Sequence, residues 1–242
     1  MEHILEVRKL NVYYKSASKS IFGKASKKQV LFDINFDVNE GEIFGIVGES
    51  GCGKSTLSKA VLGMNTLYDG EIIHHSVKPQ MIFQDPYSSL NPAWTVGRIL
   101  REPLILSGVK DKNELTGMVN DMLLRVGLDE TYARRRPSQL SGGQRQRISI
   151  AAALIARPRL IIADEPLSAL DVTIQAQIMK LLLELKNELG LTYIFISHDI
   201  DVVYQMCDRI MVMKDGHVIE SGETEELFSD PKEAYTRQLI EG

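Results

Sequence analysis

Residues 48–56 read Gly48-Glu49-Ser50-Gly51-Cys52-Gly53-Lys54-Ser55-Thr56, in which two glycines separated by four residues precede Lys and Ser. This spacing is typical of a P-loop, whose backbone N–H groups surround phosphate oxygens. The apolar run at 43–47 has the length of a strand, and apolar residues at helical spacing follow the loop. We therefore expect a strand, the loop, and then a helix whose positive dipole end faces the phosphates.

The loop residues have separate expected roles. Lys54 would reach the β- and γ-phosphates, and the hydroxyl of Ser55 would complete the shell of a magnesium ion. Cys52, beside the Lys54 ammonium, would favour its thiolate form where solvent reaches it. A Gly-rich turn opening an ordinary helix is the alternative, but the spacing and flanks favour a nucleotide. The candidate nucleotide-binding residues of the loop are Gly48, Ser50, Gly51, Cys52, Gly53, Lys54, Ser55 and Thr56.

Composition bounds the class of protein. A chain of 242 residues with 44% apolar and 25% charged residues can form one large domain or two small ones. The net charge of −4 gives no global reason to expect nucleic acid. Cys52 and Cys207 are too few for a disulfide framework, and no apolar run of about 18 residues or signal sequence occurs. We expect a chain that is neither membrane-spanning nor secreted.

The N-terminal part alternates between apolar and polar residues over 4–14 and 30–38, which predicts two strands. Tyr13 and Tyr14 end the first strand. They could stack on a base, or one could pack in the core while the other covers a sheet edge, and strand position alone leaves both readings open. The Lys-rich insert at 15–29 is interpreted as a solvated loop.

A second candidate anion site follows a helical segment that is expected around 115–126 and ends at Gly127. The motif Leu140-Ser141-Gly142-Gly143-Gln144 opens a helix that runs to Ala156. Ser141 and Gln144 form a capping box, so helix N–H donors lie beside a glycine pair. A plain cap needs no second glycine, yet phosphate contact and simple capping both remain open.

Carboxylates follow a strand of buried type at 160–163. Asp164 and Glu165 lie at its carboxyl end, where open α/β sheets bind ligands, and complete a Walker B pattern. Asp164 would hold magnesium through water, and Glu165 would orient or deprotonate the attacking water. Solvation of a turn is the alternative reading, which the P-loop in the same chain disfavours.

Three further signals complete the C-terminal half. Asp171 is expected to cap a helix with an apolar stripe that Gly190 ends. The strand at 191–196 then places His198 at the same sheet edge as the carboxylates, where a functional role is favoured over a structural one. Asp215-Gly216 between two apolar segments predicts a hairpin.

Taken together, these motifs resemble one family over nearly the whole chain, the ATP-binding subunits of ABC transporters, for which Leu140 to Gln144 is highly specific. The resemblance implies an α/β fold with a P-loop NTPase core, a mixed sheet, an N-terminal antiparallel β subdomain and an inserted α-helical subdomain. It also implies a single nucleotide-binding domain at 1–242. Its core would comprise about 1–85 and 158–242, and a helical insertion at about 86–157 would carry the signature.

The same resemblance assigns roles to positions that match the family motifs. Tyr14 resembles the adenine-stacking residue, with Tyr13 as the fallback, and Gln84 resembles the Q-loop glutamine that senses magnesium and the membrane partner. His198 resembles the switch histidine. The signature residues Ser141, Gly142, Gly143 and Gln144 would bind the γ-phosphate held by another subunit, and Asp171 would end the D-loop. Glu165, His198 and Gln84 are thus the expected catalytic residues, and Ser55, Gln84 and Asp164 the expected magnesium residues.

Within the family, residues 84–92, 96–103 and 235–239 resemble ATPases of peptide and nickel importers, and Arg136-Pro137-Ser138-Gln139 leans toward nickel or metallophore uptake. The resemblance implies ATP and Mg²⁺ as cofactors. The implied partners are a second ATP-binding subunit, identical or sister, two transmembrane permease subunits and, indirectly, an extracytoplasmic solute-binding protein, with no nucleic acid. The implied location is peripheral, on the cytoplasmic face of the cell membrane.

Two other classes of P-loop protein fit these residues less well. Soluble ABC ATPases of DNA repair or translation usually carry two nucleotide domains or a long heptad arm, and neither occurs in this sequence. A small-molecule P-loop kinase would not explain the residues from Leu140 to Gln144. We therefore expect a transport-coupled ATPase.

Overall fold

The computed structural model describes residues 2–16, 26–75 and 79–241. By its internal contacts the chain divides into two compact units, one made of Met1–Lys78 with Thr192–Gly242 and the other of Pro79–Leu191. The first unit holds the P-loop and His198, and the second holds Gln84, the Asp164-Glu165 pair and the signature motif. The division into a core and an insertion at about 86–157 stays a prediction.

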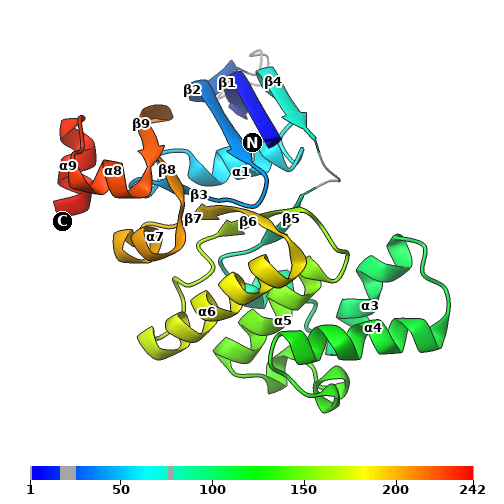
Figure 1. Cartoon of the computed structure of the whole chain (residues 1–242). Helices are drawn as coiled ribbons and strands as arrows, with labels where there is room; N and C mark the ends of the chain where they lie inside the picture. Colours follow the sequence, from blue (N-terminus) through cyan, green and yellow to red (C-terminus); the bar gives the residue numbers. More distant parts are fainter. Residues whose placement is uncertain (1, 17–25, 76–78, 242) are drawn as a thin grey trace. The chain divides into compact units, whose positions relative to one another are not determined.

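The first unit contains a three-stranded antiparallel sheet in the order β2 (Ser26–Asn39), β1 (His3–Ser16), β4 (Tyr68–His74), seen side by side in Figure 1. The two strands expected at 4–14 and 30–38 are confirmed and are longer than predicted. Lys15 pairs with Lys27, so both ends of the Lys-rich insert are strand and not loop. The loop prediction was wrong there because backbone pairing continues past the apolar residues. Residues 17–25 of the insert lie outside the described ranges.

A second sheet of the same unit holds the P-loop strand. β3 (Ile43–Val47) pairs in parallel with both β7 (Thr192–Ile196) and β8 (Arg209–Lys214), and β9 (His217–Glu223) pairs antiparallel with β8. All residues of β3 and β7 are buried, which explains their continuous apolar runs. The unit's helices are α1 (Lys54–Val61), α7 (Ile200–Met206), α8 (Thr224–Ser229) and α9 (Ala234–Glu241). The sheet is therefore mixed, as expected.

The predicted hairpin between β8 and β9 is confirmed. Asp215 and Gly216 have φ angles of 46° and 80°, both in the left-handed region that a tight hairpin turn of this kind requires. Glycine is needed at the second position, because a Cβ there would lie 2.1 Å from the Val30 carbonyl oxygen.

The second unit contains the parallel pair β5 (Gln80–Ile82) and β6 (Leu160–Asp164) and most of the long helices. The helices are α2 (Pro86–Ser89), α3 (Val96–Leu106), α4 (Lys112–Arg125), α5 (Gly142–Leu154) and α6 (Val172–Leu189), with short 3-10 helices η1 (Glu130–Arg134) and η2 (Pro137–Gln139). The predicted ends hold, since Gly127 and Gly190 both have positive φ. Figure 1 shows α3 and α4 lying beside each other at one end of this unit.

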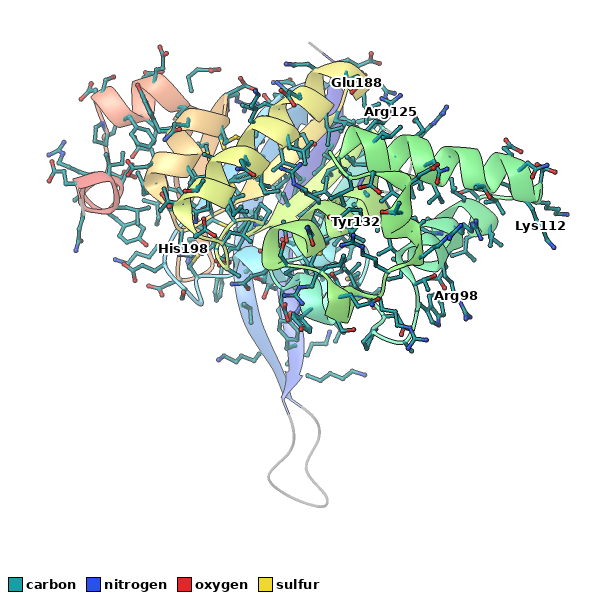
Figure 2. All side chains as sticks on the ribbon, turned by 90° about the horizontal axis from the view of Figure 1, so that it is seen from below. Arg98, Lys112, Arg125, Tyr132, Glu188 and His198 are labelled. Carbon is teal, nitrogen blue, oxygen red and sulfur yellow. The ribbon has the colours of Figure 1, made fainter. Side chains whose placement is uncertain are left out.

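A backbone hydrogen bond and two ion pairs stabilise the helical part of the second unit. The Val96 N–H donates to the Arg135 carbonyl oxygen at 2.8 Å, which ties the start of α3 to the end of η1. Arg125 of α4 pairs with Asp121 and with Glu188 of α6, and Figure 2 shows Arg125 and Glu188 facing one another. Among the helices of the described ranges, none combines the length and apolarity needed to cross a bilayer.

Candidate functional site

The P-loop connects β3 to α1 as the sequence predicts. Gly48 and Gly53 have φ angles of 148° and 115°, and a Cβ at these positions would lie 2.2 Å from the Met213 carbonyl oxygen and 2.5 Å from Leu31 Cδ2. A Cβ at Gly51 would meet nothing within 4 Å. The loop is thus packed closely from behind and open at Gly51, the geometry that a phosphate group needs for access to backbone N–H donors.

The Lys54 side chain is 6% exposed and turns into the loop. Its Nζ donates to the carbonyl oxygens of Gly48 at 2.6 Å and Glu49 at 3.1 Å. Ser55, in the same first turn of α1, is exposed. One ammonium group and one accessible hydroxyl therefore lie at the start of a helix, as phosphate and magnesium binding would require.

Cys52 differs from the expectation of a favoured thiolate. The side chain is 5% exposed, so the solvent access on which that expectation depended is missing. Burial raises the pKa of the Cys52 thiol above its ordinary value, and the Lys54 ammonium offsets this only in part. The thiol is therefore protonated at neutral pH and less reactive than its charged neighbour suggests.

The two adjacent tyrosines at the end of β1 have different surroundings. Tyr14 is 39% exposed, and its hydroxyl lies 3.4 Å from Thr56 Oγ1 in the first turn of α1. The Lys27 ammonium lies over the Tyr13 ring, 5.6 Å from the ring centroid. Desolvation and a hydrogen bond to Asp69 raise the pKa of Tyr13. Tyr14 is the tyrosine that contacts the P-loop helix, which favours it over Tyr13 for base stacking.

His198 is exposed and follows β7, the parallel neighbour of the P-loop strand. The Ser197 N–H donates to the Ile46 carbonyl oxygen at 3.4 Å, so the two strand ends lie level. Asp199 then caps α7. His198 and the P-loop thus share the carboxyl edge of one sheet, where the sequence analysis placed them.

Tyr235 was missed as a site residue by sequence reasoning. Its hydroxyl oxygen accepts from the Glu49 N–H at 3.4 Å, and the Lys214 ammonium lies 4.3 Å from its ring centroid. The residue appeared only within a family-like segment near the C-terminus, and nothing in its local spacing predicts contact with the P-loop.

In the second unit, β5 and β6 end side by side and bring Gln84 to Glu165. The Gln84 Nε2 donates to Glu165 Oε2 at 2.8 Å. Glu165 has a φ of 46°, a left-handed conformation that is uncommon and costly for a residue other than glycine. Its carbonyl oxygen accepts from the N–H and hydroxyl of Ser168. The turn therefore holds the Glu165 carboxylate in a defined position against an amide donor.

The capping box at the signature motif is confirmed. The Ser141 N–H donates to Gln144 Oε1 at 3.0 Å, and the Gln144 N–H donates to Ser141 Oγ at 3.3 Å. The Gln144 Nε2 also donates to the Tyr132 hydroxyl of η1 at 3.0 Å. The Gln144 side chain is thus held by the cap and by η1, and its expected contact with ATP stays a prediction.

The two signature glycines have different reasons to be glycine. A Cβ at Gly143 would lie 2.9 Å from Ile174 Cγ2 in the first turn of α6, which Asp171 caps. At Gly142 the nearest atom, Leu170 Cδ2, would be 4.0 Å away. Gly143 therefore allows α5 to approach α6, whereas Gly142 leaves open space at the helix N-terminus.

This difference predicts opposite effects of the same substitution. Gly143→Ala should lower the free energy of unfolding by about 1 to 3 kcal/mol, because the stiff β-branched Ile174 must move. Gly142→Ala is the matched control and should leave stability unchanged or raise it by up to about 1 kcal/mol through helix propensity. Thermal unfolding of both variants checks this, and equal shifts would contradict the packing argument.

The expected magnesium ligands are oxygen donors of the kind that Mg²⁺ prefers, namely the hydroxyl of Ser55, the amide oxygen of Gln84 and the carboxylate of Asp164. Among the described residues no group of three or more His, Cys, Asp or Glu side chains forms a closed metal cage. Mg²⁺ at nucleotide sites commonly takes only one or two carboxylates, with phosphate oxygens and water completing its shell. Each of the three expected donors is therefore of a chemical type that suits such an ion.

Comparison with known proteins gives consistent matches. A family model described as ABC transporter matches residues 31–168. The oligopeptide transport ATP-binding protein OppF of Bacillus subtilis is 41% identical, over 99% of this chain and 82% of the relative. The dipeptide transport ATP-binding protein DppF of Haemophilus influenzae is also 41% identical, over 96% of this chain and 75% of the relative.

Solved structures match over similar lengths. The structure of cbiO1 from Clostridium perfringens, described as part of the ABC transporter complex cbiONQ, has a TM-score of 0.78 and 32% identity, covering 95% of this chain and 92% of that one. The ATP-binding cassette MJ0796, in a dimeric post-hydrolysis state with ADP and Pi, has a TM-score of 0.77 and 30% identity, covering 91% and 98%.

Proposed function

The chain belongs to the ABC transporter family as an ATP-binding subunit that hydrolyses ATP, and from that premise we propose that it powers the uptake of peptides. The observation that supports ATP-driven transport is that one chain has two helix N-termini suited to binding phosphate. One follows the P-loop and begins at Lys54, and the other is the helix that Ser141 caps beside two glycines. The peptide assignment is supported by the names of relatives at 41% identity over nearly the whole chain.

The first unit would bind the nucleotide. Lys54 would exchange its contacts with loop carbonyl oxygens for contacts with the β- and γ-phosphates, and the loop N–H groups would donate to the same oxygens. Ser55 would offer its hydroxyl to the metal ion. Tyr14, beside the first turn of α1, would stack on the adenine, and His198 would donate to the γ-phosphate.

Hydrolysis would rely on Glu165. Its carboxylate, held by the Gln84 amide at 2.8 Å, would orient the attacking water and accept its proton. Asp164 would hold the metal through water, and Gln84 would contribute its amide oxygen. A Mg²⁺ ion held by these residues would supply positive charge to the phosphate oxygens as they become more negative.

A second subunit would complete each site. We propose that Ser141, Gly142 and Gly143 of one chain donate to the γ-phosphate held by the P-loop of the other, with the open space at Gly142 admitting the phosphate. Asp171 would lie at the interface between the two chains, near the shared ATP. In such an arrangement ATP would lie in the interface between this chain and a second subunit, which would be identical to it or a sister subunit.

The remaining partners follow from transport. We propose two transmembrane permease subunits, an extracytoplasmic solute-binding protein that acts through them, and a peripheral location on the cytoplasmic face of the membrane. Peptides are proposed over nickel or metal chelates, since the lean toward nickel rests only on residues 136–139. A soluble ATPase of DNA repair or translation is disfavoured, because the relatives reported above are named as transport subunits.

Tyr87 tests the proposed contact with the permease. It follows Gln84 in α2, is 56% exposed, and has the Arg145 guanidinium 4.0 Å from its ring centroid. Arg145 lies in the first turns of the signature helix. Tyr87→Ala should therefore leave ATP binding by the isolated subunit near normal but reduce uptake of a labelled oligopeptide by about tenfold in the assembled transporter.

The control is Tyr204→Ala in α7, where another tyrosine is 52% exposed. It should leave both ATP binding and uptake near normal. Full peptide uptake by a well-assembled Tyr87→Ala complex would remove the support for a permease contact at α2. Uptake of a nickel chelate with no uptake of peptide by the unmodified complex would overturn the peptide assignment.

A further inference from the structure

The helical part of the second unit carries an open surface cavity of about 650 Å³ that the ATPase site does not use. It lies among the start of α3, the middle of α4 and η1. The side chains and backbone that line it are those of Thr95, Gly97, Arg98, Arg101, Thr116, Val119, Asn120, Glu130, Thr131, Ala133 and Arg134. Its volume is within the range of small-molecule sites, about 300 to 1,000 Å³.

The charges around this cavity are strongly unbalanced. Arg98, Arg101 and Arg134 line it, against the single carboxylate of Glu130. Glu130 accepts a hydrogen bond from Asn120 at 3.2 Å, and within 2–16, 26–75 and 79–241 no acidic side chain forms an ion pair with any of the three guanidinium groups. Three unneutralised cations thus share one cavity in a chain of net charge −4. All three side chains are exposed, and such a cluster creates a local positive potential that attracts an anion.

Two of the arginines are held in place by other groups. The Arg98 guanidinium lies 4.1 Å from the Trp94 ring centroid, which leaves its in-plane N–H groups able to donate. Figure 2 shows Arg98 on the surface of the second unit. The Arg101 Nη2 donates to the Thr116 hydroxyl at 3.0 Å, which leaves its other N–H groups. Little conformational entropy would remain to be lost on binding an anion.

The backbone around the cavity also favours binding of an anion. Thr95 caps α3, a helix of 11 residues, so its positive end is at the cavity. A Cβ at Gly97 would lie 3.0 Å from the Ala133 carbonyl oxygen, which shows how closely α3 approaches η1. The cavity is therefore bounded by elements in fixed contact and not by a loose loop.

We propose that this cavity binds the phosphate group of a ligand that carries it as an ester or a polyphosphate. Three guanidinium groups less one carboxylate leave a charge of +2, which matches the charge of about −1.5 to −2 on a phosphate monoester. Arginine forks suit the several oxygens of phosphate. The volume exceeds that of one phosphate, so the ligand has a body attached. The source is a soluble phosphate compound or a lipid headgroup.

This site goes beyond ATP hydrolysis and the proposed peptide uptake, and η1 connects it to the signature motif. Tyr132 lies between two cavity-lining residues, Thr131 and Ala133, and its hydroxyl accepts from Gln144 Nε2 of the signature at 3.0 Å. A ligand bound across α3, α4 and η1 would therefore change the position of Tyr132, whose hydroxyl holds the Gln144 side chain.

The first experiment uses the full chain in a Lys54→Ala background, so that the P-loop does not compete, and inorganic pyrophosphate as the probe. Titration followed by NMR of the arginine Nε–H groups should shift the signals of Arg98, Arg101 and Arg134 saturably, with a smaller shift at the Gln144 side-chain amide. Replacing all three arginines by Gln should raise the Kd by about tenfold or more, since hydrogen bonds to charged groups are lost.

A matched control removes the same charge from exposed positions of the same unit outside the cavity, with Lys110→Gln, Lys112→Gln and Lys180→Gln. It should keep the pyrophosphate Kd. Circular dichroism of both triple variants verifies folding, and single Arg→Gln variants replace a triple variant that does not fold. A Kd raised equally by both triple variants would overturn the proposal, because net charge and not the cavity would then explain binding.

Vesicles separate the two phosphate sources. Retention by phosphatidylcholine vesicles containing phosphatidylglycerol, lost with the three Arg→Gln changes and absent with phosphatidylcholine alone, would assign the site to a lipid headgroup. Pyrophosphate binding without such retention would assign it to a soluble compound. If neither probe engages the three arginines, or if oligoglutamate binds them more tightly than pyrophosphate, a phosphate site is ruled out.

Discussion

Lys54→Ala should abolish ATP binding at concentrations that saturate the unmodified chain. The Lys54 Nζ donates to two loop carbonyl oxygens and is 6% exposed, so it is already positioned in the loop without a ligand. Removing at least two charge-assisted contacts with phosphate should raise the Kd for Mg-ATP roughly hundredfold or more. ATP at a hundredfold excess over the unmodified chain's Kd should stabilise that chain by about 2.7 kcal/mol, and the variant by no more than about 0.4 kcal/mol.

The measurement is the shift of the unfolding temperature with Mg-ATP, expected to be roughly 5 to 10 °C for a chain of this size and at most about 2 °C for Lys54→Ala. Lys59→Ala provides the matched control, because Lys59 lies in the same helix but is exposed. It should keep the full shift. An equal shift in Lys54→Ala would show that the P-loop assignment is wrong.

Glu165→Gln should keep ATP binding and lower turnover by about 10² to 10⁴, the usual contribution of a general base. Glutamine keeps the size of the side chain, and its amide oxygen can still accept from Gln84 Nε2, now at 2.8 Å from the carboxylate. The left-handed backbone at this position is also unchanged. Only the basicity of the group is lost, so the Kd and the turnover number should respond differently.

The matched control is Glu184→Gln on α6, which removes an exposed carboxylate of the same unit that pairs with Lys180. Steady-state phosphate release should be normal in this control. If Glu165→Gln also releases phosphate within a few-fold of the normal rate, Glu165 does not act on the attacking water, and another group must do so.

Much of the fold could be predicted from sequence because its signals are local. The strand Ile43–Val47, the cap at Asp171 and the turn at Asp215-Gly216 each follow from residues within a few positions of one another. The ends of the Lys-rich insert could not be predicted in this way. Their strand pairing comes from the partner strand, which overrides a polar local sequence.

The candidate site shows the same difference between features that local sequence predicts and contacts that it does not. Glu165 and His198 could be predicted as candidate residues because both follow buried strands at a carboxyl edge, a topological rule that needs no coordinates. The contact between Gln84 and Glu165, the Gly143 contact with Ile174, and the Tyr235 contact with Glu49 join residues far apart in sequence. Spacing carries no information about such pairs. The neighbouring Lys54 led to the expectation of a low pKa for Cys52. Burial of the thiol raises this pKa instead, and burial could not be predicted from the local sequence.

The shared ATP site is tested most directly by the mass of the Glu165→Gln chain in solution, with and without Mg-ATP, by light scattering after size-exclusion chromatography. Bound ATP persists in this variant, so it should be a dimer with ATP and a monomer without it. Adding Ser141→Arg, which obstructs the capped helix N-terminus but leaves the P-loop intact, should give a monomer that still binds ATP. Adding Ser107→Arg at the exposed end of α3 instead should leave the dimer unchanged.

The same measurement should be repeated with the sister subunit present, because a heterodimer is one form of the proposed pair. With either partner, the account predicts ATP-dependent dimers of Glu165→Gln that Ser141→Arg abolishes. Dimers that persist with ATP when Ser141→Arg is present on every signature motif of the pair would contradict a site shared between two chains.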